Sequence, residues 1–133
     1  MVRRLNPSTV REVPPIYRGI YTHAVELTAP EKLLLISGQI GVTVDGITPP
    51  TFEEQCHQAM NNVEAILADV GLGVEDILKV TYYLTSAGYL GKLAEIRRER
   101  WGSSESAPAV TTLVISELAA PDLQVEIEVT AGR

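Results

Sequence analysis

A helical pattern near the middle of the chain limits the fold more than any other segment. Apolar residues recur every three or four positions from Cys56 to Val70, which is the spacing of one face of an α-helix. Thr51 and Glu54 form the S/T-x-x-E capping box that starts a helix, and the glycines of "GLG" at 71–73 can end it. Such a helix must bury its single apolar face against another element.

Segments typical of β-strands lie on both sides of this helix. Residues 18–28 and 33–42 precede it, separated by the turn "TAPEK", and together predict an opening hairpin. Residues 76–86, "DILKVTYYLTS", follow it and are rich in β-branched and aromatic residues. Residues 1–17 are rich in proline and polar groups, which predicts an irregular lead-in.

A second, more charged helix is expected from Gly88 to Trp101, followed by two C-terminal strands. The first of these strands lies in "APAVTTLVIS", which is uncharged, and the second, "LQVEIEVTAGR", alternates apolar and polar residues. The order ββαβαββ within one domain, residues 1–133, predicts an α+β fold with a mixed sheet carrying both helices on one face. The other sheet face would be half covered in a monomer, so we expect a closed oligomer.

Composition restricts the class of partner. The hydrophobic fraction of 45% and charged fraction of 21% fit a soluble globular protein. The longest apolar run, Leu33–Ile36, is far shorter than the roughly 20 residues of a membrane span, and no secretory signal is visible. A single cysteine fits a reducing cytoplasm, so we expect a cytoplasmic protein without a membrane partner. The net charge of −6 argues against nucleic acid, and the arginines of "EIRRER" are expected to form surface pairs with neighbouring glutamates.

Motifs for metals and cofactors are missing from the sequence. His23 and His57 are far apart, and Cys56 beside His57 lacks the spacing of a zinc site. We expect Cys56 in the core and His57 on the solvent side of its helix. No phosphate-binding, dinucleotide-binding or G-x-S-x-G motif occurs, so we expect neither a cofactor nor a nucleophilic triad.

Several segments, taken in order, resemble one known family. They are "YTHAVEL", "LLISGQIG", "TFEEQCHQAMNNVEAILADVGLGVEDILKVTYYLT", "APAVTT" and "LQVEIEVTA". Together they resemble the RidA/YjgF/YER057c/UK114 superfamily, the reactive intermediate deaminases, from about Gly19 to Ala131. The resemblance implies a chorismate-mutase-like fold and a barrel-like homotrimer with a small-molecule ligand in three inter-subunit clefts. It also implies hydrolysis, without a cofactor, of imines or enamines released by pyridoxal-phosphate enzymes.

The resemblance also implies site residues at the matching positions. In that family an arginine holds the substrate carboxylate, a glutamate positions the attacking water and a tyrosine lines the pocket. Here the tyrosine is Tyr21, the backbone glycine of "SGQ" is Gly38 and the glutamate is Glu126. The alternation places Glu126 on the polar side of its strand, where a hydrated surface carboxylate would look the same. His23 shares the face of Tyr21, and a cleft histidine or a packed one fits equally well.

One position departs from the family pattern. The family arginine sits two residues after the proline of "PAR", whereas this chain has "PAV", which places Val110 there. A guanidinium is a planar, charged, bidentate partner for a carboxylate, and valine offers only apolar surface. Arg97 could supply the missing cation, although an ordinary surface arginine fits better. The favoured reading is a less acidic ligand against a wall formed by Val110, Thr111 and Thr112.

The resulting hypothesis is a divergent family member that hydrolyses a small imine, enamine or related carbonyl compound. Glu126 would orient or deprotonate water, the Gly38 N–H would polarise the substrate, and Tyr21 with Thr112 would complete the pocket. Activity on simple 2-imino acids should be poor without the arginine. The alternative is a non-catalytic ligand-binding or regulatory trimer. The endoribonuclease activity sometimes attached to the family fits least, because the chain is acidic and has no basic stripe.

Overall fold

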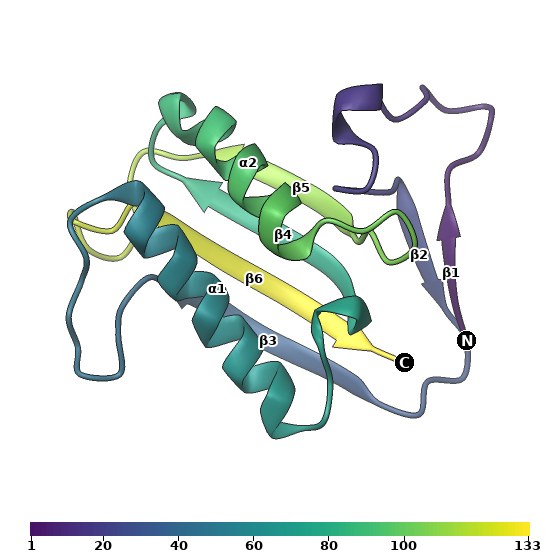
Figure 1. The fold of residues 1–133 in the computed structure, drawn as a ribbon, viewed down its shortest axis with the longest axis horizontal. Helices are drawn as coiled ribbons and strands as arrows, with labels where there is room; N and C mark the ends of the chain where they lie inside the picture. The colour runs from purple at the N-terminus through teal and green to yellow at the C-terminus, as the bar shows by residue number, and fades with distance from the viewer.

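The computed structural model describes all 133 residues, and its main feature is a four-stranded sheet with two helices on one face (Figure 1). Strand β5 runs parallel to β4, because a helix carries the chain back between them, whereas β6 is antiparallel to both β3 and β4. This arrangement confirms the expected α+β mixed sheet. The spatial order is β3-β6-β4-β5, with β3 at Leu33–Ile40, β4 at Ile77–Leu84, β5 at Ala109–Val114 and β6 at Val125–Gly132.

The first helix, α1 (Phe52–Asp69), begins and ends where the sequence predicts. The Thr51 hydroxyl accepts a hydrogen bond from the Glu54 N–H at 3.2 Å, and the Glu54 carboxylate accepts one from the Thr51 N–H at 3.3 Å. Gly71 follows the helix with a φ of +74°, a left-handed conformation that glycine adopts without strain. The second helix, α2 (Leu90–Trp101), follows a short 3₁₀ turn. Neither helix is long and apolar enough to cross a membrane.

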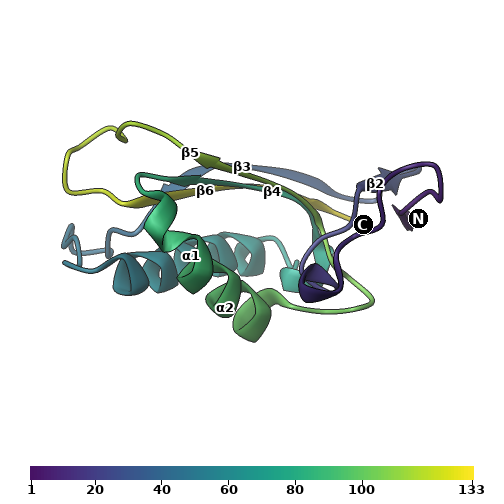
Figure 2. The same ribbon diagram turned by 90° about the horizontal axis from the view of Figure 1, so that it is seen from above.

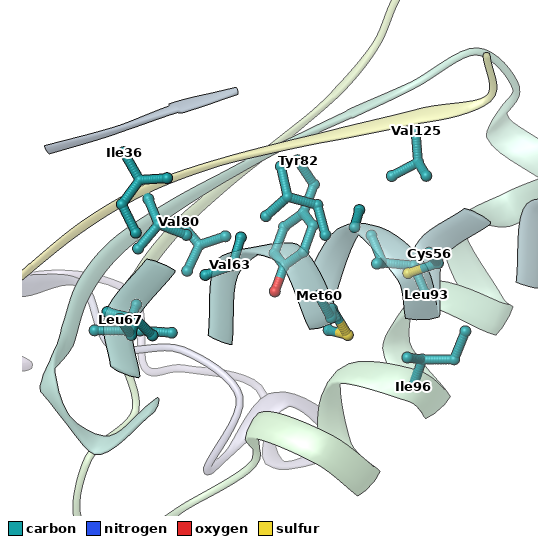
Figure 3. Packing of buried hydrophobic residues seen from close by; sticks show 14 of the residues in the cluster. Ile36, Cys56, Met60, Val63, Leu67, Val80, Tyr82, Leu93, Ile96 and Val125 are labelled. Atoms are coloured by element: carbon teal, nitrogen blue, oxygen red, sulfur yellow. The ribbon is translucent and has the colours of Figure 1, made fainter. Parts of the chain in front are cut away.

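Both helices cover the same face of the sheet, and the opposite face has no covering element (Figure 2). On the covered face, Val125, Ile127 and Val129 of β6 are buried at alternate positions, as the alternation predicts. The ring of Tyr82, from β4, enters the same core and points toward α1 (Figure 3). Cys56 lies in this core as expected, and its burial raises the pKa of the thiol to about 12.

The N-terminal region differs from the predicted irregular lead-in and hairpin. Val2–Leu5 forms a strand, β1, which pairs antiparallel with β2 (Ala24–Leu27) in a separate small sheet, and a 3₁₀ turn lies between them at Pro15–Tyr17. Strand β3 does not pair with β2, so the predicted hairpin is wrong. Instead β3 pairs with β6 on both sides of an irregularity between Ile36 and Gln39. The alternate buried residues of β6 complete the core. Just before β2, the Thr22 N–H donates to the Pro108 carbonyl at 2.8 Å, which joins the small sheet to the edge beside β5.

The arginines of α2 do not form the expected surface pairs within their helix. Arg98 donates to the carbonyl oxygens of Ile16 and Arg18, so it holds the N-terminal segment against α2. Arg100 forms an ion pair with Glu64 of α1 and so joins the two helices. Arg98 and Arg100, which were predicted to be solvated, therefore bind elements that are distant from them in sequence.

Candidate functional site

One end of the main sheet carries a pocket of about 400 Å³. It lies where β3 and β4 end and β6 begins, and the loop between β5 and β6 closes one side. Gly38 lies at its edge, and its polar side chains are Tyr83, Glu117, Glu126 and Glu128. Because three of these four are carboxylates, we call it the acidic pocket.

Glu126 is positioned by a close approach to β3. Its backbone lies opposite Ile40, and the regular pairing of β3 with β6 is interrupted between Ile36 and Gln39. Bulges of this kind re-aim side chains and are frequent beside active sites. Gly38 lies within the interruption, and a Cβ added there would be 2.7 Å from Cδ of Glu126. The missing side chain at position 38 is therefore what lets the Glu126 carboxylate lie against the strand.

Tyr83 belongs to the same pocket and was not among the residues chosen from the sequence. It pairs with Glu126 across β4 and β6, and its hydroxyl donates to Glu128 at 3.3 Å. Desolvation and the neighbouring carboxylates raise the pKa of the phenol, so it remains a hydrogen-bond donor at neutral pH. The alternation of β4 could have revealed it, because a buried Tyr82 requires Tyr83 to face the uncovered side.

A larger cavity, of about 680 Å³, lies under the N-terminal segment, and we call it the arm cavity. Tyr21 and His23 both line it, with ring centroids 6.0 Å apart. The Nε2 atom of His23 lies 2.6 Å from the Arg11 carbonyl oxygen, so this ring nitrogen carries a proton and donates it. Asn6 accepts hydrogen bonds from the Thr22 hydroxyl and the His23 N–H at 3.0 and 2.9 Å. The N-terminal segment is thus fixed to the residues just before β2.

The two hollows lie at opposite ends of the molecule. The arm cavity is beside β1 and β2, whereas the acidic pocket is beside the loop that joins β5 to β6 (Figure 1). The structure therefore brings Gly38 and Glu126 together but places Tyr21 far from both. A site that used all three residues would need two chains arranged head to tail.

The three residues expected to form one wall are divided by the pleat of β5. Val110 pairs with the buried Val80, so Val110 and Thr112 face the helical side of the sheet. Thr111 faces the uncovered side, where its hydroxyl accepts a hydrogen bond from Lys79 at 2.6 Å. The expected wall of Val110, Thr111 and Thr112 is therefore not a single surface, and none of the three lines either hollow.

Arg97 is neither a surface residue nor part of either hollow. Only 8% of it is exposed, and its guanidinium carbon lies 4.9 Å from the centroid of the Tyr82 ring. Its Nη2 atom has no hydrogen-bond partner, and burial lowers the pKa of the side chain. The expected exposure of Arg97 is wrong, and its guanidinium lies on the face of the sheet opposite Glu126.

Comparison with known proteins identifies the family. The family model described as "Endoribonuclease L-PSP" matches residues 13–132, nearly the whole chain. The chain belongs to the RidA/YjgF family. Among curated relatives, this RidA/YjgF chain is similar to a RutC family protein of Aquifex aeolicus, with 38% identity over 118 residues that cover 88% of this chain and 91% of the relative. It is also similar to TdcF of Escherichia coli K12, named as a candidate reactive intermediate deaminase, with 28% identity over 86% of this chain and 88% of that protein.

Solved structures agree with this assignment to the RidA/YjgF family. The Rid-family protein YyfB of Yersinia pestis superposes with a TM-score of 0.83 at 26% identity, covering 99% of this chain and 98% of that one. The superposition therefore includes the N-terminal segment with β1, although the family model begins only at residue 13. The shared fold extends beyond the shared sequence pattern.

Proposed function

We propose that this RidA/YjgF-family chain is a cofactor-independent hydrolase of small imines or enamines that works as a homotrimer with its ligand in clefts between subunits. The observation that carries the proposal is the Glu126 carboxylate held against Gly38 at an interrupted strand pairing. Such a fixed carboxylate beside an open pocket can orient a water molecule and accept its proton. The name of the relative TdcF supports the same class of reaction.

The reaction requires no group beyond substrate and water. Water attacks the carbon of the protonated imine and transfers a proton to Glu126, which gives a neutral tetrahedral carbinolamine. Glu126 then returns this proton to nitrogen and accepts the hydroxyl proton as the C–N bond breaks, so that a carbonyl compound and ammonia form. The proton on Glu126 finally passes to ammonia, which leaves as ammonium. The carboxylates of Glu117, Glu126 and Glu128 favour the protonated imine, which is the more electrophilic form, because opposite charges nearby stabilise a cation. Tyr83 supplies a neutral hydroxyl beside the same carbon.

Charge at the two ends of the chain supports a head-to-tail assembly. The acidic pocket carries three glutamates, whereas the arm cavity contains Arg4, Arg11 and Arg18. Opposite potentials on two surfaces favour their association and fix its orientation. A ring of three chains in this orientation would place Tyr21 of one subunit beside Glu126 of the next. Each acidic pocket would then face an arm cavity, and neither surface would be left uncovered.

Val110 limits the choice of substrate within this class. Without a guanidinium at position 110, an α-carboxylate loses the bidentate partner that it has in the family pattern. The acidic pocket adds a further repulsion, because three carboxylates already surround the proposed reaction centre. We therefore propose low activity on simple 2-imino acids and higher activity on imines that carry no carboxylate beside the reacting carbon.

The decisive experiment is the decay of imines generated in situ. An amino-acid oxidase supplies 2-iminobutanoate and an amine oxidase supplies neutral imines, and the rate is compared for the wild type and Glu126→Gln. We expect the substitution to lower kcat roughly 10²- to 10⁴-fold, as expected for loss of a general base. Glu95→Gln is the matched control, because Glu95 is an exposed carboxylate of α2 paired with Lys92. Full activity in Glu126→Gln would refute the proposal.

A non-catalytic ligand-binding trimer is the second candidate, and Val110 is the observation that favours it. It would be supported if the wild type bound small ligands but turned over no imine in the panel. An endoribonuclease, the activity in the description of the family model, is the weakest candidate. A net charge of −6 and three glutamates in the pocket would repel a phosphate backbone.

A further inference from the structure

The arm cavity has a charge opposite to that of the whole protein. The chain has a formal net charge of −6, yet three arginines and one glutamate line this cavity. Arg18 and Glu12 form an ion pair at 2.6 Å. Arg4 and Arg11 have no carboxylate partner within the chain. Two unpaired guanidinium groups in one concave region attract an anion.

Arg4 is the better positioned of the two. It lies in β1 opposite Val25 of β2, and its Nε–H donates to the Ala107 carbonyl oxygen at 3.2 Å. A guanidinium has five N–H donors in a planar fork, so its remaining donors are free to bind both oxygens of a carboxylate. Burial lowers the pKa of Arg4, which indicates lost hydration that a bound anion would replace.

The position of this cation fits the proposed reaction. Tyr21 lines the same cavity, whereas Val110 does not. A carboxylate beside the reacting carbon would meet the glutamates of the acidic pocket and find no cation at position 110. A carboxylate at the far end of the ligand would avoid that repulsion. Arg4 and Arg11 both precede residue 13, where the match to the family model begins.

We propose that Arg4, assisted by Arg11, binds a carboxylate that lies at the end of the ligand remote from its imine carbon. The ligand class is then a small imine or enamine with a distal carboxylate, or the oxo acid formed from it. The choice of substrate rests on the proposed function, but the anion site itself stands on the charge and geometry of the arm cavity. Binding and turnover are therefore tested separately.

Binding is tested with glutarate, a stable dicarboxylate, by isothermal titration calorimetry on the purified full-length chain. We expect Arg4→Gln to weaken glutarate binding roughly 10- to 100-fold, which corresponds to loss of one or two charge-assisted hydrogen bonds. Arg3→Gln is the matched control, because Arg3 is the preceding residue of β1 and pairs with Glu26 at 3.1 Å outside the cavity. Arg11→Gln, an exposed position that cannot disturb the core, should weaken binding by a smaller factor. Undetectable glutarate binding by the wild type, or equal binding by wild type and Arg4→Gln, would overturn the proposal.

Turnover is tested with two imines made by amino-acid oxidases from glutamate and 2-aminobutanoate. The wild type should have a higher kcat/KM for 2-iminoglutarate, which has a distal carboxylate, than for 2-iminobutanoate, which has none. Arg4→Gln should lower only the first value, roughly 10-fold or more. Equal losses on both substrates would refute the role in specificity. If neither imine is hydrolysed while glutarate binding still depends on Arg4, the proposed reaction fails and the anion site stands.

Discussion

Val110 lies in β5 with its side chain against the core between the sheet and the helices. The strand needs only an apolar or β-branched residue there, because the neighbouring Val80 is fully buried. Val110 is only half-buried, because β5 is an edge strand of the main sheet. Because the fold requires only a modest apolar contact at position 110, we interpret the valine there as a difference in ligand chemistry from the arginine that the resemblance implies.

The substitution Val110→Arg tests this reading. We expect it to raise kcat/KM for 2-iminobutanoate about 10- to 100-fold, because a guanidinium restores a charge-assisted partner for the α-carboxylate. Steady-state decay of the imine measures the effect. Val114→Arg is the control, since Val114 lies on the same strand and the same face but is 49% exposed. The interpretation of position 110 fails if the two variants behave alike, or if the wild type already hydrolyses 2-iminobutanoate efficiently.

Arg97 supports a prediction about the stability of the fold. Its buried guanidinium has an Nη2 without a partner, and such a group costs free energy relative to an apolar side chain of similar shape. Arg97→Met should therefore raise the free energy of unfolding by about 1–3 kcal/mol, measured by urea denaturation. Catalysis should be unchanged, because the guanidinium of Arg97 is enclosed in the core beside Tyr82 and lines neither the acidic pocket nor the arm cavity. A loss of imine turnover in a stable Arg97→Met protein would instead show that this arginine acts on the ligand.

At the scale of elements, local signals predicted the centre of the chain well and its beginning poorly. Helix α1 could be placed almost to the residue, because a capping box, a regular apolar face and a terminal glycine agree. Strand β6 could be assigned to one face by its alternation. Strand β1, however, has only four residues and is stabilised by pairing with β2, a contact between distant segments that no local pattern encodes. The wrong hairpin prediction has the same cause. Closeness in sequence suggested β2 as the partner of β3, whereas β3 pairs with β6, which is distant in sequence.

The buried face of α1 predicts how stability depends on pH. The Cys56 pKa is raised to about 12 in the folded chain from an ordinary value near 9, so only the unfolded chain loses this proton just above pH 9. The unfolded state then binds fewer protons, and the free energy of unfolding falls as pH rises from about 9 to 12, by roughly 2–4 kcal/mol from this group.

Urea denaturation at pH 8, 9, 10 and 11 measures this loss. In Cys56→Ala the decline over the same range should be clearly shallower, even though the variant is less stable at pH 8. The Cys56 thiol should also resist alkylation at pH 8 until urea unfolds the chain. Rapid alkylation of the native protein would contradict the burial on which the prediction depends.

At the scale of the whole molecule, the candidate site is divided between two ends that one chain cannot join. Tyr21 lines the arm cavity, and Glu126 lines the acidic pocket at the far end of the sheet. The sequence resemblance named both residues but could not say that they are apart, because their separation depends on the length and direction of the strands between them. Their divided position is itself a reason to expect an assembly, since each end is an incomplete site.

Mixing two inactive variants tests whether neighbouring subunits complete each other. Glu126→Gln lacks the proposed base in every cleft, and Tyr21→Leu lacks the pocket residue in every cleft, so each homotrimer should hydrolyse imines slowly. Equal amounts of the two variants are unfolded and refolded together. Each cleft takes Glu126 from one chain and Tyr21 from the neighbouring chain. A cleft is therefore intact when a Tyr21→Leu chain supplies Glu126 and a Glu126→Gln chain supplies Tyr21. Random assembly of head-to-tail rings makes about one quarter of the clefts intact, so about a quarter of the wild-type rate should return. If each site lay within one chain, no mixed assembly would contain an intact site and the rate would not recover.

Light scattering on the same samples must give the mass of a trimer, and a stable monomer at micromolar concentration would exclude the assembly.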